Sequence, residues 1–194
     1  MGQRFEDLFL PHLNAAYSLA RYMTRDPAAA DDIVQESFLR AFRSFDRYRG
    51  GDAKSWILAI VRNCSFDWSK SRRRAAGLPP GEAEETAGAR PGGQRAAQAA
   101  AGDSLERWIP NADQLGDWTQ EGPETAVLRQ SEIEEVRALI GALPEPFREA
   151  LVLRELEELS YKEIAQVTGT PVGTVMSRLA RARQMLTAEL ERAR

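Results

Sequence analysis

The feature that most constrains how this chain can fold is a segment near its middle with almost no large apolar side chains. Over residues 75–102, 19 of 28 residues are alanine, glycine or proline, and Leu78 is the only large apolar residue. Such a stretch buries too little apolar surface to offset the conformational entropy lost on ordering. We therefore expect a flexible linker over residues 75–123, which divides the chain into domains over residues 1–74 and 124–194.

The charge of the chain divides in the same way. The net charge of −3 combines +4 over residues 1–74, −6 over residues 75–125 and −1 over residues 126–194. Within the last block, residues 171–194 hold five arginines against two glutamates. The acidic charge thus lies in the middle of the chain, and both flanks can present basic surfaces to an anionic partner.

The composition excludes several classes of protein. The chain has one cysteine, Cys64, and one histidine, His12, so it lacks the ligands of a structural zinc site and cannot form an intramolecular disulfide. It has no run of about 18 apolar residues that would span a membrane, and its N-terminus lacks the cleavage site of a secretion signal. These features predict a cytoplasmic protein with no membrane span, no metal and no cofactor.

Both flanks have the apolar spacing of helices, and neither has a convincing alternating strand pattern. We therefore predict an all-α fold, in which two small helical domains are joined by the linker. Before the linker, the predicted helices span residues 8–20, 28–45 and 54–73. After it, they span residues 124–142, 147–157 and 160–167, and a last helix starts at residue 171.

The last two helices carry the signals of a helix-turn-helix. Ser160 and Glu163 have the spacing of a capping box, which starts a short helix. Gly169 is placed to end that helix. Thr170 is then expected to cap the last helix, with Pro171 at its first position. A short helix, a tight turn with glycine and a longer helix form a motif that reads duplex DNA.

The last helix has two distinct kinds of face. Four apolar residues share one face and are expected to pack inward: Val175, Leu179, Ala182 and Leu186. Four polar residues lie mostly elsewhere: Ser177, Arg178, Arg181 and Arg183. An arginine in the major groove can donate two hydrogen bonds to guanine, and helix N-terminal amides can hold a phosphate. DNA reading is therefore favoured over a solvated basic helix in a small bundle.

A second group of polar residues follows residue 30, in the sequence DDIVQESFLR. Helical geometry puts five residues opposite the apolar stripe: Asp32, Gln35, Glu36, Leu39 and Arg40. Paired carboxylates can belong to a metal-dependent catalytic centre, but no second acidic cluster with histidine completes one. Periodicity alone favours a solvated face, and a protein-docking face is the better of the two functional interpretations.

Residues 45–74 interleave basic and aromatic side chains. Such surfaces suit single-stranded nucleic acid, since each base stacked on an aromatic ring contributes about 1–3 kcal/mol. Trp56 and Trp68 have helical spacing and fit a core better than a stacking platform. Tyr48 and Arg49 precede the helix and are freer to meet a strand. The residues alone leave single-strand binding open.

Three motifs occur in this chain in a fixed order: DDIVQESFLRAF, then WILAIVRN with SKSRRR, then LPEPFREALVLRELEELSYKEIAQVTGTPVGTVMSRLARAR. Together they resemble the bacterial RNA polymerase sigma factors of the extracytoplasmic-function (ECF) group within the sigma-70 class. The resemblance covers residues 5–74 and 124–190. It implies a promoter-specificity subunit, without catalytic activity of its own, that directs core RNA polymerase to −10 and −35 elements and initiates DNA melting.

The resemblance also implies roles for particular residues. Docking on the clamp helices of the polymerase β′ subunit falls to Asp31, Asp32, Gln35, Glu36 and Leu39. Binding of the melted −10 strand falls to Tyr48, Arg49, Lys54, Trp56, Arg62, Asn63, Lys70, Arg72 and Arg73. Among these, Asn63 helps to hold a base flipped out of the stack. Reading of the duplex −35 element falls to Thr170, Thr174, Met176, Ser177, Arg178 and Arg181.

The same resemblance implies two further partners, the β flap of the polymerase and an anti-sigma factor that covers both domains. It also has limits. Relatives often carry a basic residue where Met176 stands, and sometimes a larger one where Ala180 stands. The −35 sequence that this chain reads is therefore not predicted from the family.

Two other functions compete with that of a sigma factor. An autonomous regulator would use the helix-turn-helix alone, and would need a dimer to read two half-sites, although no long heptad seam is visible. A metal-dependent nuclease would use Asp31, Asp32 and Glu36.

Overall fold

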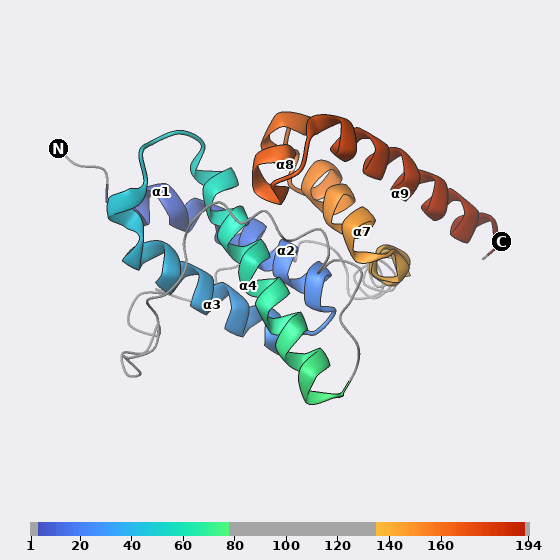
Figure 1. Cartoon of the computed structure of the whole chain (residues 1–194), viewed down its shortest axis with the longest axis horizontal. Coiled ribbons are helices and arrows are strands. Elements are labelled where there is room, and N and C mark those ends of the chain that lie inside the picture. Colours follow the sequence, from blue (N-terminus) through green and yellow to red (C-terminus); the bar gives the residue numbers. More distant parts are fainter. Residues whose placement is uncertain (1–3, 78–134, 193–194) are drawn as a thin grey trace, which may run out of the picture.

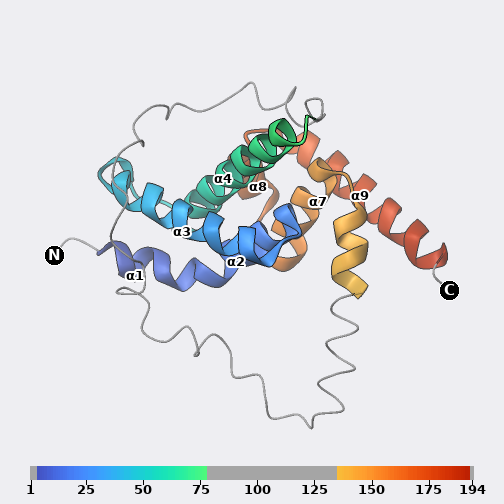
Figure 2. The ribbon, with the colours of Figure 1, turned by 90° about the horizontal axis from the view of Figure 1, so that it is seen from below.

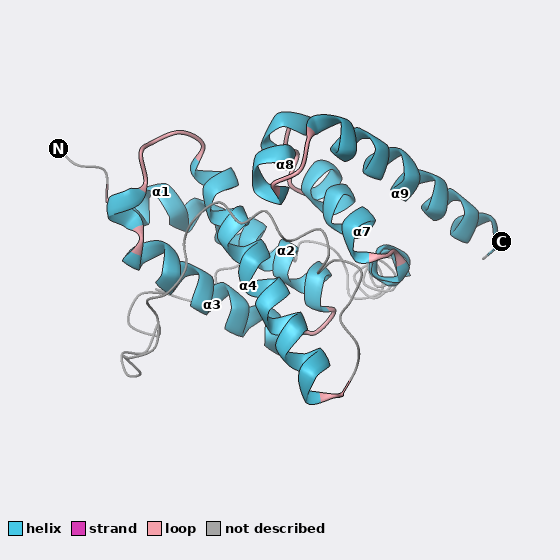
Figure 3. Ribbon diagram, in the orientation of Figure 1, coloured by secondary structure: helices cyan, strands magenta, loops and turns pink. Residues whose placement is uncertain are grey.

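The computed structural model describes residues 4–77 and 135–192. In these two parts every regular element is a helix, which confirms the all-α prediction (Figure 3). Most of the predicted linker, and the first part of the helix predicted over residues 124–142, lie outside the described residues. No helix in the described parts is long and apolar enough to cross a membrane.

The described N-terminal part folds from α-helices joined by short turns (Figure 1). Its elements are α1 (Phe5–Phe9), η1 (Leu10–His12), α2 (Leu13–Thr24), α3 (Pro27–Arg43), η2 (Phe45–Arg47) and α4 (Ala53–Ala75), where η1 and η2 are 3₁₀ turns. The helix predicted over residues 8–20 is thus three elements. Pro11, which has no amide hydrogen to donate, stands in the 3₁₀ turn between α1 and α2.

Local side-chain bonds fix where these helices begin. The Asp26 carboxylate accepts a hydrogen bond of 3.3 Å from the amide of Ala29 and so caps α3. The Asp52 carboxylate accepts one of 2.7 Å from the amide of Ser55 and caps α4. These caps set the directions of α3 and α4, which pack on each other and on α2.

The core of the N-terminal part lies between α2, α3 and α4. Its largest fully buried side chains are Phe9, Leu19, Ile57, Leu58 and Val61. Cys64 is also buried, as a small apolar residue would be.

The described C-terminal part is also helical. Residues 135–142 form a helix, followed by α7 (Glu145–Leu151), the π-helical turn η5 (Val152–Leu156), α8 (Tyr161–Thr168) and α9 (Val172–Arg192). The single helix predicted over residues 147–157 is therefore two elements. In η5 the amide of Glu157 donates to the carbonyl of Val152 at 3.1 Å, five residues back. Such π turns are rare and occur frequently at functional sites.

The predicted capping box is present. The amide of Ser160 donates to the Glu163 carboxylate at 2.6 Å, and the amide of Glu163 donates to the Ser160 hydroxyl at 3.3 Å. Gly169 ends α8 with a φ of 65°, a left-handed conformation in which glycine meets no steric penalty.

The start of α9 differs from the prediction by one residue. The amides of Thr174 and Val175 donate to the carbonyl of Pro171, at 2.9 and 3.1 Å, so the helix begins at Val172. The hydroxyl of Thr170 lies 2.8 Å from the hydroxyl of Thr168. The turn between α8 and α9 is thus braced by two threonine side chains.

The two described parts pack against each other. α4 contacts α8, and α2 contacts α7 and η5. In both views the C-terminal helices lie beside α2 and α4, while α1 and α3 lie farther from them (Figure 1, Figure 2). Arg148 of α7 links the parts directly, because its guanidinium donates to the carbonyl of Met23 in α2 at 3.4 Å. The carbonyls of Gly141 and Leu143 accept its other bonds, at 3.1 and 3.0 Å.

Candidate nucleic-acid interface

The helix-turn-helix presents a polar surface on α9. Val175, Leu179 and Ala182 are buried, as predicted, and anchor the helix on the domain core. The side chains predicted to read DNA point outward to different degrees. Met176, Ser177 and Arg181 are exposed, and Thr170, Thr174 and Arg178 are half-buried. The structure therefore brings the predicted −35 residues to one end of α9 and the turn before it.

Arg183 behaves differently from its neighbours on α9. Its guanidinium donates to the carboxylate of Glu155 at 2.7 Å, and this hydrogen bond raises the pKa of Arg183. The side chain is thus already paired with η5, whereas no ion pair involves Arg178 or Arg181 within the described residues.

The acidic face of α3 is open. Asp31, Asp32 and Gln35 are exposed, and Leu39 is 37 % exposed beside them. Glu36 is half-buried and accepts a hydrogen bond of 2.6 Å from Arg40. The structure thus gathers all five predicted docking residues along one helix.

Phe42 extends the exposed surface of α3. The helical spacing of the apolar residues predicts that Phe42 lies on the buried stripe of this helix, yet 60 % of it is exposed. Its ring centroid lies 5.4 Å from that of Phe5, edge to face. The spacing of three residues from Leu39 was the signal that could have placed it on the docking side.

Among the described residues, no group of three or more histidine, cysteine, aspartate or glutamate side chains is placed to hold a metal ion. Of the carboxylates of α3, that of Glu36 is held by Arg40.

Aromatic residues of α1, of the loop before α4 and of the first turn of α4 form a cluster at the edge of the core. Trp56 packs on Phe9, with ring centroids 5.1 Å apart, and on Tyr48, with centroids 5.3 Å apart. The hydroxyl of Tyr48 donates to the carbonyl of Gly51 at 2.7 Å. Both Tyr48 and Trp56 are half-buried, so they support the loop, and Arg49 is the exposed side chain on it.

The predicted −10 residues of α4 fall into two sets. Asn63, Arg72 and Arg73 are exposed, and Lys70 is half-buried. The guanidinium of Arg72 lies over the ring of Trp68, 5.1 Å from its centroid, which is a cation–π distance. This part of α4 presents an amide and several cationic side chains to solvent.

The other set, Lys54 and Arg62, is covered by the C-terminal part. The Lys54 ammonium donates to the carbonyl of Glu157 at 2.7 Å and lies 3.2 Å from its carboxylate. The Arg62 guanidinium is paired with the carboxylate of Glu149. Only 15 % of the Arg62 side chain and 2 % of the Glu149 side chain are exposed.

Glu149 and Glu157 were missed by sequence reasoning. Glu149 lies directly before Ala150 and Leu151, which are buried. A charged residue at an inward-facing position of an amphipathic helix is a signal of a buried partner, because an unpaired buried charge is strongly unfavourable.

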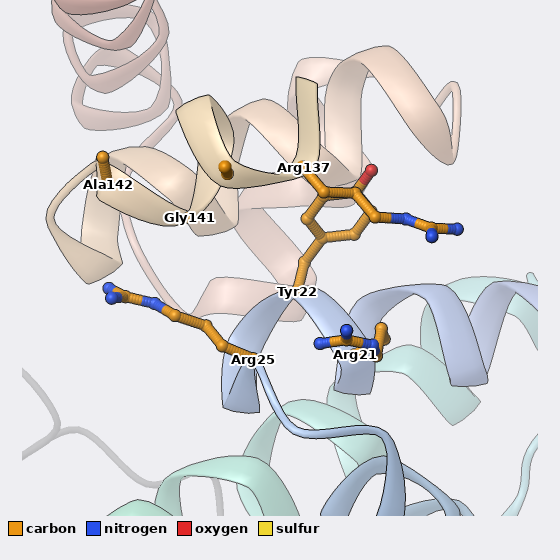
Figure 4. Close-up of a pocket in the computed structure, with 7 residues that line it drawn as sticks. Arg21, Tyr22, Arg25, Arg137, Gly141 and Ala142 are labelled. Carbon is orange, nitrogen blue, oxygen red and sulfur yellow. The ribbon is translucent and has the colours of Figure 1, made fainter. Parts of the chain in front are cut away.

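A cleft of about 490 Å³ lies where α2 meets the helix of residues 135–142. Its lining residues are Arg21, Tyr22, Arg25, Arg137, Ala138, Gly141 and Ala142. Tyr22 points toward the helix that carries Arg137, and Arg25 extends toward Gly141 and Ala142 (Figure 4). Among the described residues, the lining holds three arginines and no carboxylate.

Comparison with known protein families accounts for both described parts. Residues 8–75 match the model described as sigma-70 region 2, and residues 133–186 match the model described as sigma-70, region 4. The chain belongs to the sigma-70 family. Because both regions match, the chain is a sigma factor and not a regulator that uses a helix-turn-helix alone.

Known sigma factors resemble this one along most of its length. The chain is 34% identical over 188 residues to the RNA polymerase sigma-H factor of Pseudomonas aeruginosa, covering 96% of this chain and 86% of that one. It is 34% identical over 177 residues to the ECF RNA polymerase sigma-E factor of Haemophilus influenzae, covering 89% and 79% of the two chains.

Solved structures show a similar fold. The sigma factor RpoE of Bartonella quintana, in complex with the anti-sigma factor NepR, aligns with a TM-score of 0.64 at 22% identity, over 98% of both chains. CnrH, in complex with the cytosolic domain of CnrY, aligns with a TM-score of 0.58 at 22% identity, over 96% of this chain and 87% of that one.

Proposed function

We propose that this sigma factor uses three separate surfaces to recruit core RNA polymerase and open a promoter. The acidic face of α3 binds the polymerase, the exposed part of α4 binds the melted −10 strand, and α9 reads the −35 duplex. The proposal is supported by one observation above all: the two described parts of the chain match two different regions of sigma-70 factors. The first two surfaces lie in the part that matches region 2, and the third lies in the part that matches region 4.

The −35 surface suits a major groove. Met176, Ser177 and Arg181 are exposed on one helix, and Arg181 can donate two hydrogen bonds to a guanine. Met176 offers an apolar contact to a thymine methyl group where a basic residue would select an acceptor. The preferred −35 sequence is therefore specific to this chain.

The −10 surface suits a single strand. Asn63, Arg72 and Arg73 are all exposed on α4. An amide side chain can bond to the edge of a base that has left the stack, and two arginines can bind the backbone that carries it. These groups supply base recognition and affinity on the same helix.

The proposed docking surface on α3 combines charged side chains with exposed apolar ones. Asp31, Asp32 and Gln35 are exposed next to Leu39 and Phe42. Interfaces of this kind use an apolar centre for affinity and a charged rim for orientation. This face is proposed to bind the β′ clamp helices, and the C-terminal part is proposed to contact the β flap.

The proposal includes control by an anti-sigma factor. It is supported by the fold shared with RpoE and CnrH, whose structures were solved with NepR and CnrY. The chain acts in the cytoplasm by binding, with no cofactor and no catalytic activity of its own.

Promoter opening by the reconstituted holoenzyme tests the proposal. Core polymerase and this chain are mixed with genomic promoter fragments, and unpaired thymines are mapped by permanganate. Reactive thymines around a −10 element are expected only when both components are present. The Asp32→Arg variant is expected to lose core binding and opening together, while an exposed substitution away from the three surfaces, Asn14→Ala, retains both. Absence of reactive thymines at every promoter contradicts the proposal.

A further inference from the structure

The carboxylate of Glu149 is buried at the boundary between the two described parts. The residue lies on α7 and is 1 % exposed, and its ion-pair partner, Arg62, lies on α4 in the other part. A buried carboxylate without a partner is strongly unfavourable. This pair therefore forms only when the two parts are closed on each other, and it disfavours partial separation.

A second polar contact stands beside the first. Lys54 of α4 donates to the backbone carbonyl of Glu157 and is also paired with its carboxylate. Glu157 directly follows the π turn η5, and 6 % of it is exposed. The residue directly after the π turn is thus the one that binds Lys54.

The N–H groups that Arg62 and Lys54 donate in these contacts are the same groups that would donate to a phosphate. Guanidinium and ammonium groups bind carboxylates and phosphates through the same N–H donors. While Glu149 and Glu157 hold them, Arg62 and Lys54 are unavailable to a nucleic-acid backbone. Asn63 and Arg73 stay exposed on the same helix, so the closed form withholds part of the −10 surface.

Other charges at the same boundary oppose closure. Burial, followed by the nearby charge of Arg25, lowers the pKa of Arg148 to about 10. The cleft next to it is lined by Arg21, Arg25 and Arg137, and by no carboxylate from the described parts of the chain. Repulsion among these arginines acts against the two ion pairs, although Arg148 also donates to the carbonyl of Met23 across the boundary.

We propose that Glu149 and Glu157 form an intramolecular latch, in which they occupy Arg62 and Lys54 and so keep the free sigma factor closed and weak in binding single-stranded DNA. The role of Arg62 and Lys54 in DNA binding rests on the proposed function. The closure itself does not, so the two are tested by separate measurements.

The first measurement is the separation of the two parts. Cysteines introduced at the exposed positions Asp7 and Gln184 carry a donor and an acceptor dye, while the native Cys64 is buried. The double variant Glu149→Gln with Glu157→Gln removes both carboxylate charges and keeps the side-chain shapes. We expect the energy transfer of the full chain to fall toward an open value. Unchanged energy transfer overturns the latch.

The charge-matched control removes two acids outside the boundary. Glu189→Gln with Glu191→Gln changes the net charge by the same amount near the end of α9, where Glu189 is paired with Arg192. This variant is expected to keep the wild-type energy transfer. A fall equal to that of the latch variant overturns the proposal, because net charge would then explain the opening.

A charge swap distinguishes loss of the ion pair from misfolding. Arg62→Glu and Glu149→Arg each place like charges together and are expected to open the chain. Their combination restores an attractive pair and is expected to recover energy transfer. Failure of the combination to recover it, with helical content intact by circular dichroism, counts against the pair as the latch.

The second measurement is binding to a fluorescent single-stranded DNA of mixed sequence. We expect the latch variant to bind about tenfold more tightly than the charge-matched control, because the affinity of a state that is rarely populated is reduced by its population. An open variant with unchanged affinity overturns the latch as a control on DNA binding, while promoter opening by the holoenzyme still supports the proposed function. Failed promoter opening refutes that function and leaves the energy-transfer result standing.

Discussion

At the scale of single residues, the surroundings of a side chain decide its availability more than its type does. Arg62 and Arg73 are both arginines on α4, yet the first is paired with a buried glutamate and the second is exposed. The resemblance to sigma factors implies the same role for both. The difference arises from a contact with residues more than seventy positions away along the chain, which no local pattern records.

Asn63 is the residue whose loss should separate promoter opening from polymerase binding. It is exposed on α4, and the Asn63→Ala variant is expected to lose about 1–3 kcal/mol of base recognition. Permanganate reactivity at the −10 element should fall, while affinity for core polymerase stays at the wild-type value. Asn14→Ala, at an exposed position on α2, is the control. Equal loss of opening and core binding would point to misfolding.

Glu145 should make the folded chain less stable as the pH rises. Burial raises the pKa of Glu145, and its Oε1 atom has no hydrogen-bond partner among the described residues. The folded state then binds the proton more tightly than the unfolded state, so stability falls as the pH rises from the ordinary carboxyl pKa through the raised one. Glu145→Gln is therefore expected to raise Tm at neutral pH and to give no gain below the ordinary carboxyl pKa.

Thermal unfolding followed by circular dichroism measures this difference across the pH range. Glu191→Gln, at an exposed position of α9, is the control and should leave Tm unchanged. A gain from Glu145→Gln that is the same at all pH values would show that the charge of Glu145 is not the cause.

At the scale of elements, the sequence predicts best where one local signal settles the outcome. Ser160 and Glu163 specify the start of α8 through their own bonds, and Gly169 specifies its end through its φ. The predicted helix over residues 147–157 lacks such a signal. Its change from α to π geometry at Val152 lies where η5 packs against α2, and periodicity within one segment carries no information about that packing.

On α9, the exposed side chain of Arg181 is the proposed contact to the −35 element. Arg181→Ala should weaken binding of holoenzyme to −35 DNA and reduce the salt dependence of binding by about one unit of slope, if the side chain contacts a phosphate. Loss of a contact to a base edge would instead lower specificity at one position. Arg192→Ala, at the far end of α9, should change neither quantity. An unchanged affinity for Arg181→Ala would remove it from the −35 surface.

At the scale of the whole molecule, the sequence predicts two helical parts but not their relative position. The Ala-, Gly- and Pro-rich composition of the middle segment indicates a connection and no geometry. The closed arrangement depends on the pairing of Lys54 and Arg62 with Glu157 and Glu149. These four residues lie in two blocks that each look like an ordinary solvated or basic surface when read alone.

Closure and DNA binding should be linked in both directions. If DNA binds the open form, adding single-stranded DNA must open the wild-type chain, since coupling between two equilibria is reciprocal. The energy transfer between dyes at positions 7 and 184 should therefore fall with added DNA, with a midpoint equal to the dissociation constant measured directly. Across the latch variants, that constant should be inversely proportional to the open fraction measured without DNA. A dissociation constant that does not vary with the open fraction would show that Lys54 and Arg62 take no part in binding the strand.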